Sequence, residues 1–139
     1  MYSDILIPTD GSQGAKAALQ HGIEIATQWD ATLHALYVVD LRLARSGPLL
    51  QMLQEEGRQA LRDNEVAGTQ AGLSVVTELV EGYPHEEILE YIREHGIDMV
   101  VMGTHGRTGI DRIILGSVAE RVVRRSPVPV LTVREEESD

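Results

Sequence analysis

The chain alternates short apolar runs with longer segments of helical periodicity, and this alternation constrains the fold more than any other feature. The short runs are rich in β-forming residues and occupy residues 5–7, 33–39, 74–80, 98–102 and 128–133. Between them, helical spacing begins near residues 13, 48, 84 and 116. Strands joined by helices form right-handed crossovers and therefore a parallel sheet. The sequence thus predicts an α/β fold, an open five-stranded parallel sheet with helices on both faces.

The composition of three runs predicts where their strands lie in the sheet. Residues 98–102 are almost wholly apolar, which is typical of a central strand buried on both faces. Thr77 and Glu78 interrupt the third run and Pro129 lies in the last, so both strands are expected at edges. In open α/β sheets, ligands bind beyond the carboxyl ends of the strands where the strand order reverses. The loops after the first and fourth strands therefore form the candidate site.

Length, charge and cysteine content narrow the class of protein. The 139 residues fit one domain, expected over residues 1–134 and followed by an acidic tail at residues 135–139. The net charge of -10 argues against partners such as nucleic acid or an anionic membrane. The chain has no cysteine, which excludes disulfides and thiolate metal sites. Because it also lacks a basic leader and a run of about 20 apolar residues, we expect a cytoplasmic protein.

Glycines at 103, 106 and 116 surround the segment between the fourth strand and the last helix. Gly103 would let the backbone leave the strand close to a sugar. Gly106 and Gly116 would permit left-handed or crowded backbone and keep side chains away from phosphate oxygens. The N–H groups of Ser117 and the residues after it would point at an anion, which the helix dipole also favours. This segment is therefore the predicted phosphate-binding loop.

Two further features of this segment bear on that prediction. Arg107 and Arg112 can supply positive charge to a phosphate group. Ser117 and Glu120, however, also fit a capping box, which stabilises a helix start without any ligand. The spacing of the last helix turns three valines inward, Val118, Val122 and Val123.

Asp10 and His105 each admit two interpretations. Asp10 can contact a ribose or Mg²⁺, or it can close a turn by bonding its own backbone. His105 can touch phosphate or lie exposed in the loop. The other histidines lack metal-ligand spacing. The chain also lacks a Walker lysine motif, a dinucleotide fingerprint and a nucleophile elbow, so catalysis would be slow hydrolysis at most.

The pattern Gly103-x2-Gly106-x9-Gly116-Ser117 resembles the signature of ATP-binding universal stress proteins. The resemblance covers the whole chain. It extends to the segments at residues 7–12, 36–40, 82–84 and 119–133.

This resemblance implies an adenine nucleotide alpha hydrolase-like fold with strand order 3-2-1-4-5. It implies ATP, ADP or AMP as ligand, with Mg²⁺ and an Asp10 contact. The nucleotide-binding positions are, for the nucleoside, Pro8, Thr9, Asp10 and the backbone of Val38; for the sugar, Met102 and Gly103; and for the phosphates, His105, Gly106, Arg107 (from its charge), Gly116, Ser117 and Val118. Many members carry threonine or serine where this chain has Ala119, which would lower ATP affinity or favour AMP and ADP.

The resemblance also bears on partners and role. Family members commonly dimerise through the last strand, so a homodimer is expected through Val128, Val130, Leu131 and Val133; alternatively, Pro129 alone protects the edge of a monomer. The expected function is that of an ATP-binding, nucleotide-responsive stress or signalling module with at most slow hydrolysis. The alternatives are a dimeric scaffold of the same fold that has lost nucleotide binding, or a weak ATPase.

Overall fold

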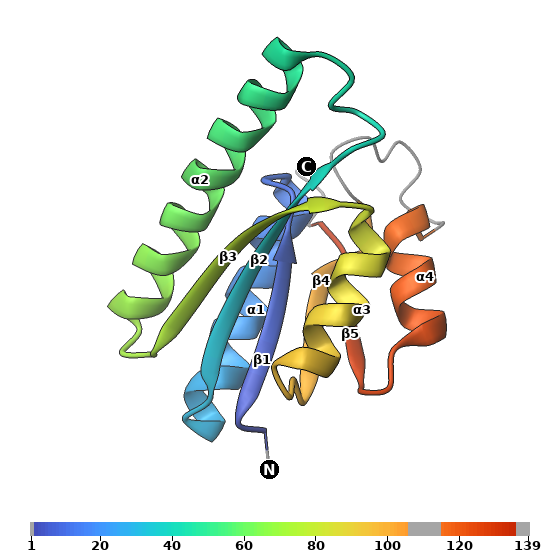
Figure 1. The fold of residues 1–139 in the computed structure, drawn as a ribbon. Coiled ribbons are helices and arrows are strands. Elements are labelled where there is room, and N and C mark those ends of the chain that lie inside the picture. The colour runs from blue at the N-terminus through green and yellow to red at the C-terminus, as the bar shows by residue number, and fades with distance from the viewer. Residues whose placement is uncertain (1, 106–114, 136–139) are drawn as a thin grey trace.

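The computed structural model describes residues 2–105 and 115–135 and contains one parallel sheet of five strands in the order β3-β2-β1-β4-β5 (Figure 1). Every pairing in the sheet is parallel, as predicted. The strands are β1 (Asp4–Thr9), β2 (Thr32–Asp40), β3 (Val75–Gly82), β4 (Met99–Gly103) and β5 (Val130–Val133). The helices are α1 (Gln13–Trp29), α2 (Gly47–Gln70), α3 (Pro84–Glu94) and α4 (Ser117–Arg125). The third and fifth strands lie at the edges and the fourth lies inside, also as predicted.

Helices cover both faces of the sheet. Helix α1 packs on one face of the sheet, against a cluster that includes Ile5 and Ile7 of β1. Helix α2 covers the same face near β3. Leu6, between those two isoleucines, belongs to the cluster beneath α3 and α4. In Figure 1, α3 and α4 lie side by side in front of the sheet and α1 lies behind it. This alternation along β1 is what two apolar faces require of a central strand.

Local signals in the sequence account for where the helices begin. The Ser12 hydroxyl accepts a hydrogen bond from the Ala15 N–H at 3.2 Å and so caps α1. Pro48 and Pro84 lie in the first turns of α2 and α3, where a missing N–H costs nothing. At Gly22 of α1, an added Cβ would collide with the side chain of Ile7. This glycine therefore lets α1 lie directly on β1.

Two sequence expectations for the C-terminal part were wrong. The last strand begins at Val130 and not at Val128, because residues 126–128 form a turn in which the Ser126 hydroxyl bonds both the carbonyl and the N–H of Val128. Val123 does not face the core but is 44% exposed, whereas Ala119 and Val122 are the buried residues of α4. Val118 is partly buried against the same cluster, so the inward face of this short helix runs from Val118 and Ala119 to Val122.

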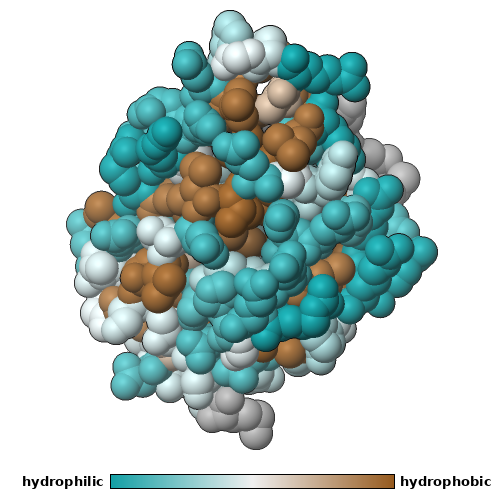
Figure 2. Space-filling model, viewed as in Figure 1, coloured by the Kyte–Doolittle hydropathy of each residue, from teal (hydrophilic) through white to brown (hydrophobic). Residues whose placement is uncertain are grey.

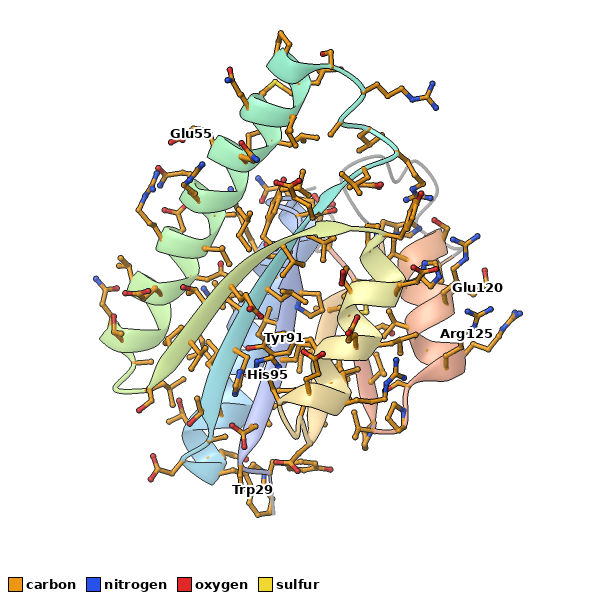
Figure 3. The ribbon with its side chains drawn as sticks, in the orientation of Figure 1. Trp29, Glu55, Tyr91, His95, Glu120 and Arg125 are labelled. Atoms are coloured by element: carbon orange, nitrogen blue, oxygen red, sulfur yellow. The ribbon has the colours of Figure 1, made fainter. Side chains whose placement is uncertain are left out.

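A polar network lies at the amino end of the sheet, far along the strands from the predicted site. His34 of β2 bonds the Tyr91 hydroxyl through Nδ1 at 2.7 Å and the Asp4 carboxylate through Nε2 at 2.9 Å. Tyr91 stacks on His95 with ring centroids 3.7 Å apart (Figure 3). Burial, followed by the charges of Glu78 and Asp4, raises the pKa of Tyr91 to about 12. The phenol therefore stays protonated and joins β1 and β2 to α3.

Over the described part of the chain, no helix combines the length and apolar character that crossing a membrane requires.

Candidate functional site

A cavity of about 430 Å³ opens at the carboxyl ends of β1, β2 and β4. Its volume is in the usual range for small-molecule sites. It lies where the strand order reverses between β1 and β4, the place predicted from the alternating pattern. The predicted site residues that line it are Pro8, Thr9, Asp10, Val38, Met102, Gly103, His105, Gly116, Ser117 and Val118. The other two, Gly106 and Arg107, lie outside the described residues, as does Arg112.

The lengths of the strands explain why a cavity forms there. The ladder between β1 and β4 joins only Ile5 and Leu6 to Met99 and Val100. On the other side, β1 pairs with β2 only as far as Thr9, which lies opposite Tyr37.

β2 nevertheless continues for three residues beyond Tyr37, pairing with β3 up to Asp40 and Gly82. Within the part of the chain that the structure describes, the last three residues of β2 therefore have a strand neighbour on one side only. The backbone edge around Val38 borders the cavity where β1 has already ended. Unpaired strand edges carry N–H and C=O groups that can bond a ligand.

The loop after β1 is a tight turn that carries Asp10 into the cavity wall. The Thr9 hydroxyl accepts a hydrogen bond from the Gly11 N–H at 3.1 Å, and the Asp10 carboxylate accepts one from the Ser12 N–H at 3.0 Å. Gly11 has φ +80°, a conformation that favours glycine. The turn role considered for Asp10 is thus confirmed, and the same residue lines the cavity. The two interpretations of Asp10 are compatible.

Gly103 is placed by packing against α1. A Cβ at this position would lie 2.9 Å from the carbonyl carbon and 3.0 Å from the carbonyl oxygen of Gly14. Conversely, a Cβ on Gly14 would lie 3.0 Å from the carbonyl oxygen of His105. The two glycines therefore let the start of α1 touch the end of β4, backbone to backbone. Sequence reasoning assigned Gly103 to a sugar contact and missed this closer constraint.

The start of α4 differs from the capping box expected for it. Gly116 is the N-cap and Ser117 is the first helical residue, and no side chain of the described residues forms a capping bond at this end. Glu120 pairs instead with Arg124 at 2.6 Å. Gly116 has φ -63°, so it does not adopt the left-handed alternative considered for it, and what its glycine contributes is the absence of a side chain.

An uncapped helix start leaves backbone donors without helical partners. The Gly116 N–H bonds the Thr104 carbonyl at 2.7 Å, and the first intrahelical bond runs from the Glu120 N–H to the Gly116 carbonyl at 2.9 Å. The N–H groups of the residues between them, Ser117, Val118 and Ala119, precede the repeating helical bonds. All three residues line the cavity. Such a helix end attracts an anion through its N–H groups and its dipole.

His105 brings a second polar group to the same wall. Its Nδ1 lies 3.1 Å from the Thr104 hydroxyl, whereas its Nε2 is buried and has no hydrogen-bond partner among the described residues. Burying an unpaired polar atom costs about 1–3 kcal/mol. A ligand atom in the cavity could pair with this nitrogen and remove that cost.

Sequence reasoning missed a charged pair at the other end of the cavity. Asp40 ends β2, Arg42 follows two residues later, and both line the cavity. The Arg42 Nε and Nη2 atoms bond the two carboxylate oxygens at 3.0 and 2.8 Å. The signal that could have found them is the rule already applied to β1 and β4, that residues just past a strand's carboxyl end face the site.

Apolar residues complete the walls of the cavity. Leu36, Leu53 and Ile88 are buried beneath it, and Leu43 and Pro84 lie nearer the surface. Apolar atoms also reach the surface among hydrophilic ones on the face shown in Figure 2. Exposed large apolar residues of the loop after β2 and the first turns of α2 are Leu41, Leu43, Leu49 and Met52. The end of the cavity at β2 is thus apolar and also holds an ion pair, and the end at α4 is rich in backbone N–H donors.

The sequence of the chain matches that of a known family. The model of the universal stress protein family matches residues 1–134. The chain belongs to this family.

Relatives of this universal stress protein are similar over nearly its whole length. Universal stress protein MJ0531 of Methanocaldococcus jannaschii is 42% identical over 141 residues, which cover 96% of this chain and 83% of that protein. The solved structure of MJ0577 from the same organism has a TM-score of 0.89 at 36% identity and covers 99% of both chains. A universal stress protein solved in complex with cAMP has a TM-score of 0.78 at 26% identity, covering 97% of this chain and 99% of that one. The sheet order agrees with their adenine nucleotide alpha hydrolase-like fold.

Metal ligands are sparse in the described part of this universal stress protein. Within residues 2–105 and 115–135, no group of three histidine, aspartate or glutamate side chains is placed to hold a metal ion. Asp10 is the carboxylate that the sequence analysis considered as a contact to Mg²⁺, and it lines the cavity. Any Mg²⁺ here would have to obtain most of its ligands from elsewhere, which is usual for Mg²⁺ bound with nucleotide phosphates.

Proposed function

We propose that this universal stress protein binds an adenine nucleotide, ATP or its products ADP and AMP, in the cavity at the β1–β4 switch point. One observation carries the proposal: the uncapped start of α4 opens into a cavity whose opposite end has an unpaired backbone edge at Val38. The first suits phosphate groups and the second suits the hydrogen-bonding edge of a base. The complex of a family member with cAMP supports the same class of ligand.

The nucleotide would lie across the carboxyl ends of the central strands. Its base would face Val38, its sugar would lie near Asp10 and Met102, and its phosphates would meet Ser117 and His105. Gly106 and Arg107, also proposed as phosphate contacts, belong to the segment between β4 and α4. The buried Nε2 of His105 would gain a phosphate oxygen as partner.

Mg²⁺ fits this proposal as a companion of the nucleotide. When bound, the ion would neutralise part of the phosphate charge. Asp10, the first acidic residue past β1, would hold its water shell or the ribose. In a chain of net charge -10, such neutralisation would help the anionic ligand to bind.

The biological role we propose is that of a cytoplasmic, nucleotide-responsive stress or signalling module that forms a homodimer through β5. Leu131 of that edge strand is 37% exposed and can pair with a second copy, with Val128 and Val130 half-buried beside it. Val133 is already buried within one chain. Light scattering after size-exclusion chromatography would give twice the chain mass, and a single chain mass would favour the monomer with Pro129 protecting its edge.

A nucleotide released from freshly purified protein, identified by mass spectrometry after heat denaturation, is the first test. Titration calorimetry with ATP and Mg²⁺ follows, using wild type and Gly116→Val, whose side chain would obstruct the start of α4. Gly47→Val is the matched control, because Gly47 begins α2, has open space around it and lies outside the cavity. Binding that is lost in Gly116→Val and kept in Gly47→Val supports the proposal.

The two alternative functions predict other results. No heat at millimolar ATP in wild type would favour a scaffold that does not bind nucleotide. ATP turnover well above background, abolished in Asp10→Ala, would favour a weak ATPase.

A further inference from the structure

The turn that follows β2 is built around Asp40. The Asp40 carbonyl accepts hydrogen bonds from the N–H groups of Leu43 and Ala44 at 3.0 and 3.1 Å. Its carboxylate accepts the Arg42 N–H at 2.9 Å in addition to the two guanidinium bonds. Arg45 donates from Nε to the Arg42 carbonyl at 3.1 Å. Backbone and side chain of Arg42 are thus both fixed by neighbours within the turn.

The ion pair between Asp40 and Arg42 occupies one edge of the guanidinium and leaves its planar face available to a ligand. Its Nε and Nη2 edge is occupied by the carboxylate, so the group cannot rotate about its own axis without breaking two bonds. The Arg42 side chain is 46% exposed, whereas that of Asp40 is 13% exposed. The carboxylate is therefore the less exposed partner, and the flat cation lies at the cavity wall.

Both members of the pair are charged at neutral pH. Burial alone would raise the pKa of Asp40, but the hydrogen bonds from Arg42 outweigh it and the pKa is lowered. The hydrogen bond to Asp40 is the largest cause of a raised pKa at Arg42, exceeding the opposing effect of burial. A guanidinium already neutralised by a carboxylate is a weak anchor for phosphate. Its planar face still stacks well on an aromatic ring.

The surroundings of Arg42 also favour a ring over a phosphate. Val38, Leu43 and Pro84 line the same end of the cavity and present apolar surface. The start of α4, which suits phosphate, lies beyond β1 at the end of β4, two strand spacings or about 10 Å from β2. The base of a nucleotide bound at Val38 would therefore lie beside Arg42, whereas the phosphates of the same nucleotide would lie away from Arg42.

We propose that Arg42, held flat by Asp40, contacts the bound nucleotide directly by stacking on its base and raises affinity for it. The inference rests on the proposed nucleotide function and adds to it a contact from the turn after β2. It assigns to this turn a role in recognising the aromatic ring, independent of how many phosphates follow.

Titration calorimetry of Arg42→Ala with three ligands tests the inference, the ligands being ATP, adenosine and tripolyphosphate. We expect ATP and adenosine to bind roughly tenfold more weakly than to wild type, by the same factor, because each loses one cation–π contact. Tripolyphosphate, which has no base, should bind both proteins equally. Intrinsic fluorescence is a poor readout here because the one tryptophan, Trp29, lies at the other end of α1 (Figure 3).

Two variants separate stacking from charge and from folding. Arg42→Lys keeps the charge and an ion pair with Asp40 but loses the flat guanidinium group. Like Arg42→Ala, it should therefore bind adenosine more weakly than wild type. Arg58→Ala removes the same charge from an exposed side chain of α2 that does not line the cavity, and it should bind like wild type. Thermal unfolding of each variant shows whether the turn itself has been lost.

Three outcomes would overturn the inference. Weaker ATP binding with unchanged adenosine binding would make Arg42 a phosphate contact. Unchanged binding of both ligands would leave it as part of the turn alone. Wild type that binds neither ATP nor adenosine would overturn the proposed function together with this inference, whereas the first two outcomes overturn the inference only.

Discussion

The contact between Gly103 and Gly14 predicts what a single methyl group does at the end of β4. In Gly103→Ala, the added Cβ would lie 2.9 Å from the Gly14 carbonyl carbon and 3.3 Å from the Ala15 nitrogen. These are backbone atoms of the first turn of α1, which cannot rotate away as a flexible side chain would. The start of α1 must therefore move off the sheet.

The size of the effect follows from two opposing contributions. Overpacking a tight contact costs about 1–3 kcal/mol. Replacing a glycine within a strand returns about 0.5–1 kcal/mol by reducing the freedom of the unfolded chain. The two ranges leave a net loss of about 0–2.5 kcal/mol, so Gly103→Ala should lower the free energy of unfolding by about 1 kcal/mol, the middle of that range, or shift Tm down by roughly 3–4 °C.

Urea unfolding and thermal unfolding measure this directly, with Gly47→Ala as the control. Gly47 also lies at a helix start and has a negative φ. Apart from its chain neighbours and the backbone of its own helix, no atom lies within 4 Å of the position that an alanine Cβ would take there. Its alanine variant should be as stable as wild type or slightly more stable. If Gly103→Ala unfolds like wild type yet binds nucleotide poorly, the packing argument is refuted and the sugar contact inferred from the sequence is restored.

The remaining predictions concern capping and the polar network. Ser117→Ala should change the free energy of unfolding by less than about 0.5 kcal/mol because its hydroxyl caps nothing, whereas Ser12→Ala should cost about 1 kcal/mol; urea unfolding compares them. Tyr91→Phe should cost about 1–3 kcal/mol in the same assay, since it leaves Nδ1 of buried His34 without its partner. The raised pKa of Tyr91 means that the folded state holds its proton more tightly, so wild type should keep this stabilisation below pH 10 and lose it between pH 10 and about 12, while Tyr91→Phe should lose less over that window. An equal loss in both proteins would contradict the assignment.

Much of the fold could be predicted because strand composition reports burial. An almost wholly apolar run predicts a central strand, as at residues 98–102. A run interrupted by polar residues predicts a strand at an edge of the sheet, as at residues 74–80. The cavity followed from topology alone, because a ligand site at a switch point needs no knowledge of side chains.

The errors arose where two neighbouring residues could serve the same role. Gly116 and Ser117 are both acceptable N-caps, and pattern matching prefers the serine, yet the chain places the glycine at the cap and leaves the helix start open. Val122 and Val123 are similarly ambiguous in a helix of nine residues, where an inward stripe is set by packing against α3. Arg42 was missed because the rule that residues past a strand's carboxyl end face the site was applied to the loops after the first and fourth strands and not to the loop after the second.

That overhang of β2 has a consequence for how the site can change. If the base is recognised through the backbone around Val38, most substitutions there leave the recognised atoms in place, and proline is the exception because it removes an N–H. Specificity for the base would then change slowly as substitutions accumulate, even where the neighbouring side chains vary freely. An engineer wishing to alter that specificity would have to lengthen β1 or shift the register of β2, since exchanging side chains would change affinity and leave the pattern of donors and acceptors intact.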